Sequence, residues 1–453
     1  MSNLITEGDI PKAIKSISMP IIIGFFFHTM FNVTDTYFAG MLSTEALAGL
    51  SISFPLFFVM ISLGAGFSGG LTALIGNEIG KKNPEQAAYI HIQGILLLLI
   101  ISLLLAFFGE GILREALSLL GAEGDVLRLS YDYTICIYLF GFSILITQGL
   151  NSGLISLGKS VYYRNFLIGS FFLNLVLDPI LMFGLLGFPR LETTGVAIST
   201  ALVNFLGMFY LGWHLYRTGF WSTIKLNNFI PNYKIFLKIK YQGVPAFLNM
   251  FLITVFFFLV NYYLSGYGFQ TLAAFGIALR IEQIALIPCI GINLAVVSVI
   301  AQNLGSGNID RIHQSYRYGM KLTLQIIVLL CVIVLLGRET LISVFTDDQQ
   351  VIDIGSNYLI FASIFTIFNS MVNINHALFQ GVQKPYLAMI NGCLRHMLLP
   401  SILFYLATRV YHLEIIWFWV IMLLINIIGM LFSYVLAFDC RRRLNLRYAT
   451  ESA

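Results

Sequence analysis

The sequence carries unusually little charge for its length. Asp, Glu, Lys and Arg make up only 11% of its 453 residues, whereas soluble proteins carry roughly 25%. Hydrophobic residues account for 58% of the chain and aromatic residues for 14%. So few charged side chains cannot cover a water-exposed surface of this size, which excludes a soluble globular fold. The lipid bilayer is the expected solvent.

Features of enzymes and of disulfide frameworks are also scarce. The chain has no HExxH zinc motif and no GxGD motif of intramembrane proteases, so we expect neither an enzyme nor a cofactor. Its five cysteines are odd in number and scattered, without a CxxC pair. They predict buried packing residues rather than disulfides or metal ligands. They are Cys136, Cys289, Cys331, Cys393 and Cys440.

Long apolar runs recur along the whole chain, each long enough to cross a hydrocarbon core about 30 Å thick. They predict an all-α membrane protein with twelve transmembrane helices. The first run contains Asp35 and lacks a small-residue cleavage site, so we interpret it as a retained helix. The predicted spans are Ile14–Tyr37, Ala46–Leu74, His91–Phe108, Tyr131–Leu157, Val161–Leu186, Gly195–Tyr216, Ile239–Leu264, Leu272–Gln302, Ser315–Leu336, Val351–Gln380, Pro385–Thr408 and Leu413–Phe438.

The placement of basic residues predicts the orientation, because Lys and Arg near helix ends stay on the cytoplasmic side. Most of the 26 Lys and Arg fall on one side if both termini are cytoplasmic. This topology accounts for the net charge of +4 without nucleic acid. We expect a monomer in the inner membrane of a bacterial or archaeal cell, with membrane lipid and small organic substrates as its partners.

An internal repeat divides the predicted helices into two pseudo-symmetric lobes. Sliding the chain by 225 residues superimposes Pro20 on Pro245, Gly80 on Gly305, Gly94 on Gly319, Tyr133 on Tyr358 and Lys159 on Lys384. Six helices per repeat give both halves the same membrane orientation, as in transporters that work by alternating access. The predicted boundaries are 1–216 for the N-lobe, 217–238 for a cytoplasmic linker, 239–438 for the C-lobe and 439–453 for a basic cytoplasmic tail.

Polar residues inside the predicted spans of the N-lobe point to a site, since an ionisable group in hydrocarbon costs several kcal/mol. His28, Asn32 and Asp35 stand at i, i+4 and i+7 and so share one helix face. Asn174 and Asp178 share a face of the fifth helix. By depth along their helices, Asp35, Asp178, Tyr133 and Thr200 all reach the outer half of the membrane.

Two neighbouring carboxylates in a low-dielectric site cannot both be charged without a large cost. The pair is therefore a candidate proton switch. The same oxygens, together with Asn174, could instead bind Na⁺, a hard cation that favours oxygen ligands. The sequence leaves H⁺ and Na⁺ open as coupling ions, and no other metal is expected.

The C-lobe lacks these acids, because at the 225-residue offset Asp178 falls on Leu403 and Asn174 on Leu399. The tenth helix instead carries a polar stripe at helical spacing, which fits either a substrate cavity or hydrogen bonds between helices. Its members are Asn369, Asn373, His376 and Gln380. Arg280, Glu282, Arg395 and His396 also lie in predicted spans, and the sequence assigns them no role.

Together these pieces resemble the multidrug and toxic compound extrusion (MATE) family over essentially the full chain. The resemblance is carried by NVTDTYFAG at Asn32–Gly40, LAGLSIS at Leu47–Ser53, GNEIGKKN at Gly76–Asn83 and FFLNLVLDPILMFG at Phe171–Gly184. It implies twelve helices in two lobes around a central cavity, and export of organic cations driven by inward flow of H⁺ or Na⁺.

Carried onto this chain, the resemblance implies a coupling site in the N-lobe formed by Asp35, Asn174, Asp178, Tyr133 and Thr200. It implies that Pro20 lets the first helix bend or straighten as the site changes protonation. Family members that bind Na⁺ in the second lobe have a seventh-helix Glu and a tenth-helix Asp. Here Asn249–Thr254 contains no acid and Asn369 occupies the likely place of the Asp, which favours the DinF-like branch.

The sequence therefore predicts a secondary active efflux antiporter that exchanges small organic, cationic compounds for H⁺. One alternative is Na⁺-driven antiport by the same N-lobe site. Another is a lipid or lipid-linked oligosaccharide flippase, which would need basic cavity residues for a pyrophosphate. Arg280 and Arg395 keep that alternative open, whereas the deepest ionisable groups of the N-lobe are acidic.

Overall fold

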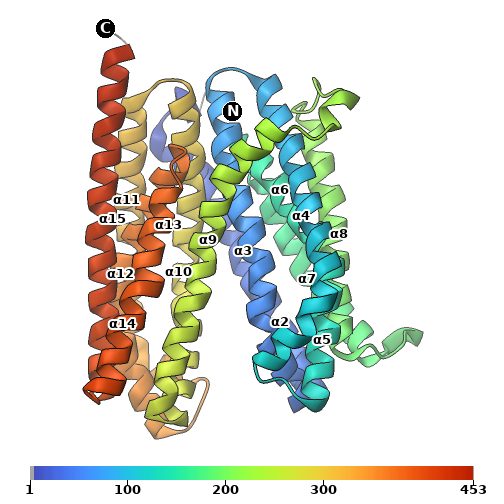
Figure 1. The fold of residues 1–453 in the computed structure, drawn as a ribbon, viewed down its shortest axis with the longest axis vertical. Helices are drawn as coiled ribbons and strands as arrows, with labels where there is room; N and C mark the ends of the chain where they lie inside the picture. Colours follow the sequence, from blue (N-terminus) through green and yellow to red (C-terminus); the bar gives the residue numbers. More distant parts are fainter. Residues whose placement is uncertain (1–4, 452–453) are drawn as a thin grey trace. The chain divides into compact units, whose positions relative to one another are not determined.

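A computed structural model describes residues 5–451, with side chains through Leu446. Within this range the chain forms helices and connecting turns without a β-strand (Figure 1). Eleven helices are long and apolar enough to cross a membrane, and one bent pair completes twelve spans. The predicted all-α membrane fold is confirmed.

Ten of the spans are single helices, most of which extend beyond the apolar runs. They are α2 (Ile10–Leu42), α3 (Thr44–Gly80), α4 (Pro84–Leu119), α7 (Val161–Phe183), α8 (Glu192–Arg217), α9 (Tyr233–Leu264), α10 (Phe269–Gly305), α11 (Ile309–Ser343), α12 (Gln349–Gly381) and α15 (Ile415–Glu451). Short 3₁₀ turns η1 (Leu185–Gly187), η2 (Leu226–Phe229) and η3 (Ser265–Tyr267) lie in the connections.

The fourth and eleventh spans are irregular, where the sequence predicted single helices. The fourth consists of α5 (Gly124–Leu139) and α6 (Gly141–Ser156), which are bent by 49°. Gly141 lies at the bend, where an added Cβ would collide with the side chain of Met60. The eleventh consists of α13 (Tyr386–Gly392), η4 (Cys393–Leu398), α14 (Leu399–Tyr405) and η5 (Leu406–Val410), and both η segments are π-helical turns.

The contacts group the chain into two compact units. One is Ile23–Phe247, and the other joins the chain up to Ile22 with the chain from Leu248 onward. Helices α2 and α9 are therefore each divided between the units, two residues after Pro20 and two residues after Pro245. The sequence analysis did not anticipate this division inside two helices. We call Ile23–Phe247 the N-lobe and the other unit the C-lobe.

Close helix packing explains why the first part of α2 belongs to the C-lobe and the first part of α9 to the N-lobe. A Cβ at Gly291 of α10 would lie 3.0 Å from the Ser18 carbonyl oxygen of α2. A Cβ at Gly66 of α3 would lie 2.6 Å from the Cα of Phe247 in α9. Only glycine allows helices this close, so each lobe is completed by a helix segment from the other half of the chain.

The repeat is also visible in the helix caps. Asn83 begins α4 with a side chain that accepts from the Gln86 amide, and Asn308 begins α11 by accepting from the Arg311 amide. Asparagine is a favoured N-cap because its side-chain oxygen satisfies a free amide of the first turn. These residues lie 225 positions apart, so the repeat preserves the cap as well as the helix.

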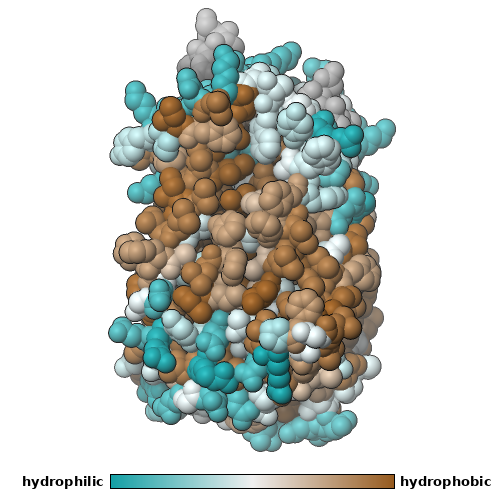
Figure 2. Space-filling model, turned by 90° about the vertical axis from the view of Figure 1, so that its right-hand side faces the viewer, coloured by the Kyte–Doolittle hydropathy of each residue, from teal (hydrophilic) through white to brown (hydrophobic). Residues whose placement is uncertain are grey.

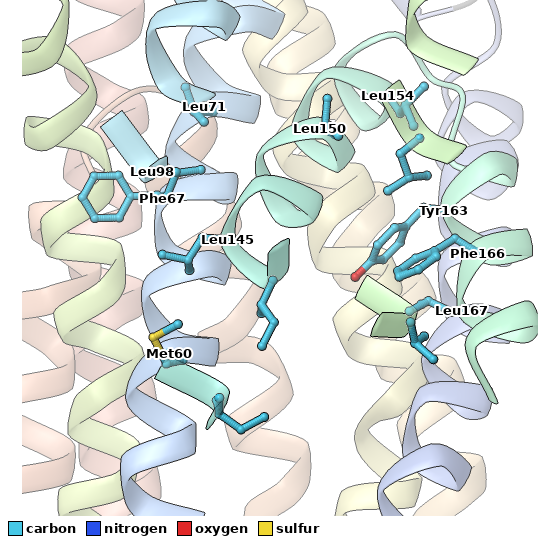
Figure 3. Packing of buried hydrophobic residues seen from close by; sticks show 14 of the residues in the cluster. Met60, Phe67, Leu71, Leu98, Leu145, Leu150, Leu154, Tyr163, Phe166 and Leu167 are labelled. Carbon is cyan, nitrogen blue, oxygen red and sulfur yellow. The ribbon is translucent and has the colours of Figure 1, made fainter. Parts of the chain in front are cut away.

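The N-lobe core is formed by apolar side chains from its helices and from the start of α9. In Figure 3, Met60, Phe67 and Leu71 of α3 lie on one side of this cluster and Tyr163, Phe166 and Leu167 of α7 on the other. The linker is attached to this unit. Gln93 of α4 donates to the Asn228 and Ile230 carbonyls at 2.8 Å and accepts from the Asn232 amide at 2.8 Å.

The surface suits a bilayer. On the face shown in Figure 2, apolar side chains cover the middle and polar side chains lie toward both ends. Large apolar side chains are exposed, among them Phe107 and Leu336, which is expected for helices that contact lipid. The five cysteines are free thiols and four of them are buried, in keeping with the predicted packing role.

Candidate functional site

Helix α7 supplies the centre of the predicted site, and two neighbouring helices approach it at glycines. A Cβ at Gly24 of α2 would lie 3.2 Å from the Arg164 Cα, and a Cβ at Gly195 of α8 would lie 2.7 Å from the Met182 amide nitrogen. The contact at Gly195 is too short for any residue with a side chain, and a Cβ at Gly24 would force its neighbours to shift. The glycines therefore bring α2 and α8 against α7, which carries Asn174 and Asp178.

Asn174 connects two helices through its amide. Its Nδ2 donates to Asp178 Oδ1 at 2.8 Å, one turn further along α7, and to Ser199 Oγ of α8 at 3.2 Å. All three residues are fully buried. The predicted pairing of Asn174 with Asp178 on one face of the fifth span is therefore present in the structure.

Asp35 of α2 lies against Asp178. It is 8% exposed, and the two carboxyl groups are close enough for their charges to interact. Two carboxylates this close in a buried site cannot both be charged without a large cost, so the pair favours holding one proton. The structure therefore contains the close acid pair that the sequence predicted.

Several acceptor atoms of this pair are buried without a donor. They are Asp35 Oδ1, Asp178 Oδ2 and the amide oxygen of Asn174. A buried acceptor without a donor costs roughly 1–3 kcal/mol. The set of oxygens is therefore suited to bind a proton or a small hard cation. No group of three or more His, Cys, Asp and Glu that could hold a metal ion occurs among residues 5–451.

Tyr133 and Thr200 occupy the same unit, and both are buried. The phenol of Tyr133 lies within electrostatic range of Asp35 and Asp178, and its ring packs against Phe57 at 6.4 Å between centroids. The Thr200 hydroxyl is buried without a partner. Ser199, one residue earlier, is the hydroxyl that bonds Asn174. The sequence pointed to the right turn of α8 but did not identify Ser199.

His28 and Asn32 form a pair of their own on α2. The Asn32 amide donates to the His28 carbonyl at 2.9 Å and lies 3.4 Å from His28 Nδ1. Both side chains are only partly buried, and the His28 ring stacks on Phe31. Pro20 lies within α2, which continues as a helix on both sides of it.

In the C-lobe, the polar stripe of α12 makes hydrogen bonds between helices. Asn369 Oδ1 accepts from Arg395 at 2.8 Å, and His376 Nε2 lies 3.1 Å from Asn391 Oδ1. The Asn373 carbonyl accepts from Asn293 at 2.6 Å. Gln380 Nε2 is buried without a partner.

Arg395 is the centre of a buried basic cluster in the C-lobe. Its guanidinium donates to Asn369 and to Asn426, at 2.8 and 2.7 Å, while its Nε has no partner. His396 follows it, with Nδ1 also buried and unpartnered. Both residues lie on the π-helical turn η4, a type of irregularity that is frequent at functional sites.

Glu282 of α10 is an acid whose charge interacts with that of Arg395. Its carboxylate accepts from Tyr358 at 3.0 Å and from Thr366 at 3.2 Å. The charge of Arg395 acts on it, but no ion pair joins the two among the described residues. Arg280 is exposed. The sequence analysis placed these charged residues in membrane spans but did not predict which of them contact one another.

Two short patterns resemble enzyme motifs and are explained by their helical context. Gly153–Ser160 has the spacing of a phosphate-binding loop, and Gly66–Gly70 that of a serine-nucleophile turn. Both motifs need a strand, a turn and a helix. Here Gly66–Gly70 lies inside α3, and Gly153–Ser156 lies inside α6. Neither can form the loop that the chemistry requires.

Comparison with known proteins decides the family. The MatE family model matches residues 20–180 and 245–406, which together cover more than half of the chain and begin 225 residues apart. The chain belongs to the MATE family. It is therefore a multi-pass membrane transporter and not an enzyme, and the two matches to this MATE protein confirm its internal repeat.

Among proteins similar to this MATE transporter is the FAD transporter of Shewanella oneidensis, 29% identical over 78% of each chain. The multidrug export protein MepA of Staphylococcus haemolyticus is 27% identical over 76% of each chain. A solved MOP superfamily transporter from Pyrococcus furiosus, described by the reverse polarity of its binding pocket, has a TM-score of 0.91 at 23% identity and covers 98% of both chains. This likeness shows the shared fold.

Proposed function

We propose that the protein is a secondary active multidrug efflux antiporter that exports small organic cations in exchange for H⁺. The proton is carried by Asp35 and Asp178 in the N-lobe. The observation that carries this proposal is the buried acid pair, whose charges interact and whose oxygens Asp35 Oδ1 and Asp178 Oδ2 have no donor. The similarity to MepA supports the choice of substrates.

The chemistry of the pair supports competition between proton and substrate. With one proton the pair carries one negative charge, and with two it is neutral. An organic cation is attracted to the charged pair, and this attraction is strong in a low-dielectric site. Protonation of the pair removes this electrostatic attraction, and the cation is released. The proton then leaves to the other side, so each turnover exchanges one cargo for protons.

The surrounding residues support the same cycle. Asn174 holds Asp178 in place from α7, and Ser199 holds Asn174 from α8. Asp35 comes from α2, whose first part is anchored in the C-lobe. A change in the acid pair can therefore be transmitted along α2, and Pro20 is a suitable point for bending because its ring removes a backbone hydrogen bond.

The test is transport in inverted membrane vesicles with a fluorescent organic cation. A pH gradient and a Na⁺ gradient are imposed separately on the wild type, on Asp35→Asn and on Asp132→Asn. We expect the pH gradient to drive uptake into wild-type vesicles and Asp35→Asn to abolish it. Asp132 is a partly exposed acid of the same unit, so its variant should keep full activity. If only the Na⁺ gradient drives uptake, the site assignment stands, but the coupling ion is Na⁺ and not H⁺.

A second candidate function is export of organic anions. The specific observation is Arg395, a buried cation whose Nε is unpartnered and which has no acid within ion-pair distance among the described residues. An isolated buried charge is costly, and an anionic substrate group would offset it. The similarity to an FAD transporter agrees with this candidate. A lipid-linked pyrophosphate could use the same group, but it would leave the acid pair without a role.

Substrate competition separates the two candidates. FAD and a fluorescent organic cation are offered to the same vesicles, with wild type and with Arg395→Gln. If anions are exported, FAD moves in the wild type, and Arg395→Gln abolishes FAD transport while cation transport survives. If FAD does not move at all, the second candidate is excluded.

A further inference from the structure

A groove of about 950 Å³ lies on the C-lobe, between α11 and α15 with α12 behind them. Helices α11 and α15 lie side by side in Figure 1 and contact one another. The groove is strongly basic, because Arg317, Lys321, Arg441, Arg442 and His313 line it. No acidic residue of the described chain is among its lining residues. The function proposed above does not use this groove.

Regular helical spacing produces the groove. His313, Arg317 and Lys321 follow one another at intervals of four along α11. On α15, Tyr434, Phe438 and Arg442 do the same. Residues four apart lie on the same face of a helix, so each helix presents one continuous stripe. The two stripes form the two walls.

Hydrogen bonds fix the floor and one end of the groove. The Tyr316 hydroxyl of α11 donates to Asn375 Oδ1 of α12 at 2.7 Å, and Asn375 Nδ2 donates to Ser433 Oγ of α15 at 2.8 Å. Arg441 lies over the Tyr316 ring at 4.8 Å. His313 Nε2 lies 2.7 Å from Asn445 Oδ1. Three helices are thus held at fixed separation, and the groove is formed before any ligand binds.

Within the described part of the chain, most positive charges in the groove have no acidic partner. Asp439 is the nearest acid along α15, and it pairs with Arg443 at 2.8 Å. Arg317, Lys321 and Arg442 have no ion-pair partner among the described residues. Cytoplasmic retention of basic residues accounts for their charge, but it does not account for a preformed hollow between two helices.

The depth of the groove matches the lipid headgroups. Helix α11 has 35 residues, which corresponds to about 52 Å and exceeds the hydrocarbon core by about 22 Å. With equal overhang at both ends, Arg317 lies about 12 Å from the start of α11 and so at the edge of the hydrocarbon. Beyond it, Leu324 and Phe438 line the groove toward the middle of the helices.

Exposed apolar side chains continue from these walls along the same helices. Val328 on α11 is 44% exposed, and Leu431 and Val435 on α15 are 55% and 62% exposed. The surface therefore changes from basic to apolar over about two helical turns, as a phospholipid does from its phosphate to its acyl chains. A small soluble anion would match only the basic end.

We propose that this groove binds one anionic phospholipid. Arg317, Lys321 and Arg442 contact the phosphate, and the acyl chains lie along the apolar surface of α11 and α15. Anionic lipids are concentrated in the cytoplasmic leaflet, and basic pockets between membrane helices on that side bind their headgroups. The sequence predicts that the start of α11 and the end of α15 are cytoplasmic. Bound lipid would link α11, α12 and α15 at that end.

The test uses the purified full-length protein after removal of lipid. Phosphatidylglycerol is titrated in mixed micelles, and both retained lipid, by native mass spectrometry, and the melting temperature are recorded. We expect saturable binding of one lipid and a rise in melting temperature. The triple variant Arg317→Ala/Lys321→Ala/Arg442→Ala should bind about 100-fold more weakly, since each basic side chain near the membrane surface contributes about 1 kcal/mol.

A matched variant controls for lost surface charge. Lys225→Ala/Lys234→Ala/Lys240→Ala removes the same charge from exposed positions outside the groove and should bind lipid as the wild type does. Both variants are melted without lipid to confirm that they fold. Three results would overturn the proposal: equal binding of phosphatidylcholine, equal loss in both triple variants, or equal stabilisation by glycerol phosphate, which would identify a site for small anions.

Discussion

The two lobes surround equivalent tyrosines of the repeat, Tyr133 and Tyr358, with different side chains. In the N-lobe, Tyr133 packs against Phe57 and lies near the acid pair of α2 and α7. In the C-lobe, Tyr358 donates its hydroxyl to Glu282 of α10. Phe57 and Glu282 are themselves 225 residues apart, so the aromatic partner of one tyrosine corresponds to the acidic partner of the other.

The lobes also differ in the sign of their buried charge. The N-lobe buries Asp35 and Asp178, whereas the C-lobe buries Arg395 beside His396. The helices, the asparagine caps and the tyrosines follow the repeat, while the buried charged groups do not. Backbone architecture and site chemistry can therefore diverge independently after duplication, because a buried side chain can change wherever its neighbours still satisfy its hydrogen bonds.

The sharpest difference expected between the lobes is the effect of Asp178→Asn on transport. The asparagine can still accept from Asn174, but the pair loses one proton site, so gradient-driven transport should fall by about 100-fold. Folding stability should not fall, since the variant replaces a costly buried acid with a neutral amide. Vesicle transport and chemical unfolding in mixed micelles measure the two effects. Retained coupling in the variant would remove the functional distinction between the lobes.

In the C-lobe, the largest effect should be on stability. Arg395→Met leaves the Asn369 and Asn426 oxygens without their donor, and we expect a loss of about 3 kcal/mol in the free energy of unfolding. Glu282→Gln, measured alone and combined with Arg395→Met, completes a double-mutant cycle. The two substitutions should be non-additive by about 1 kcal/mol, as expected for groups whose charges interact. Strict additivity would show that Glu282 and Arg395 belong to separate networks.

The two tyrosines should respond differently to loss of the hydroxyl. Tyr358→Phe removes a hydrogen bond to a partly buried carboxylate and should cost about 2 kcal/mol of stability. Tyr133→Phe breaks no hydrogen bond found in the described structure and should change stability by less than about 0.5 kcal/mol, while it reduces transport. Unfolding and vesicle assays of the two variants, made in parallel, test this. Similar effects on stability would mean that the tyrosines are equivalent.

A smaller effect tests how α8 is held against α7 in the N-lobe. Gly195→Ala places a Cβ 2.7 Å from the Met182 amide nitrogen and should destabilise the protein by about 1–2 kcal/mol. Gly169→Ala, at a position of α7 with open space around it, should instead stabilise by about 0.5–1 kcal/mol. Thermal unfolding compares them. If both variants are stabilised, the helices are not packed at Gly195 as described.

Local patterns predicted much of this arrangement. The apolar runs and the Asn174–Asp178 pair depend on spacing along one helix, the repeat depends on a constant offset along the chain, and the structure contains each of them. The bend between α5 and α6 and the partner Ser199 were not predicted. Both depend on which residue of another helix comes closest, such as Met60 at Gly141, and spacing within one segment does not contain that information.

The sequence by itself determined that the chain spans a membrane with twelve helices in two related halves, and that acids lie within the first half. These properties follow from hydropathy and from the cost of charge in lipid, which act on each segment separately. Only the tertiary structure decided that Asp35 meets Asp178, that Glu282 meets Tyr358, and that α2 and α9 are each divided between the lobes. Those outcomes depend on the register and rotation of one packed helix against another, which side-chain shape at close contacts such as Gly195 and Gly66 selects.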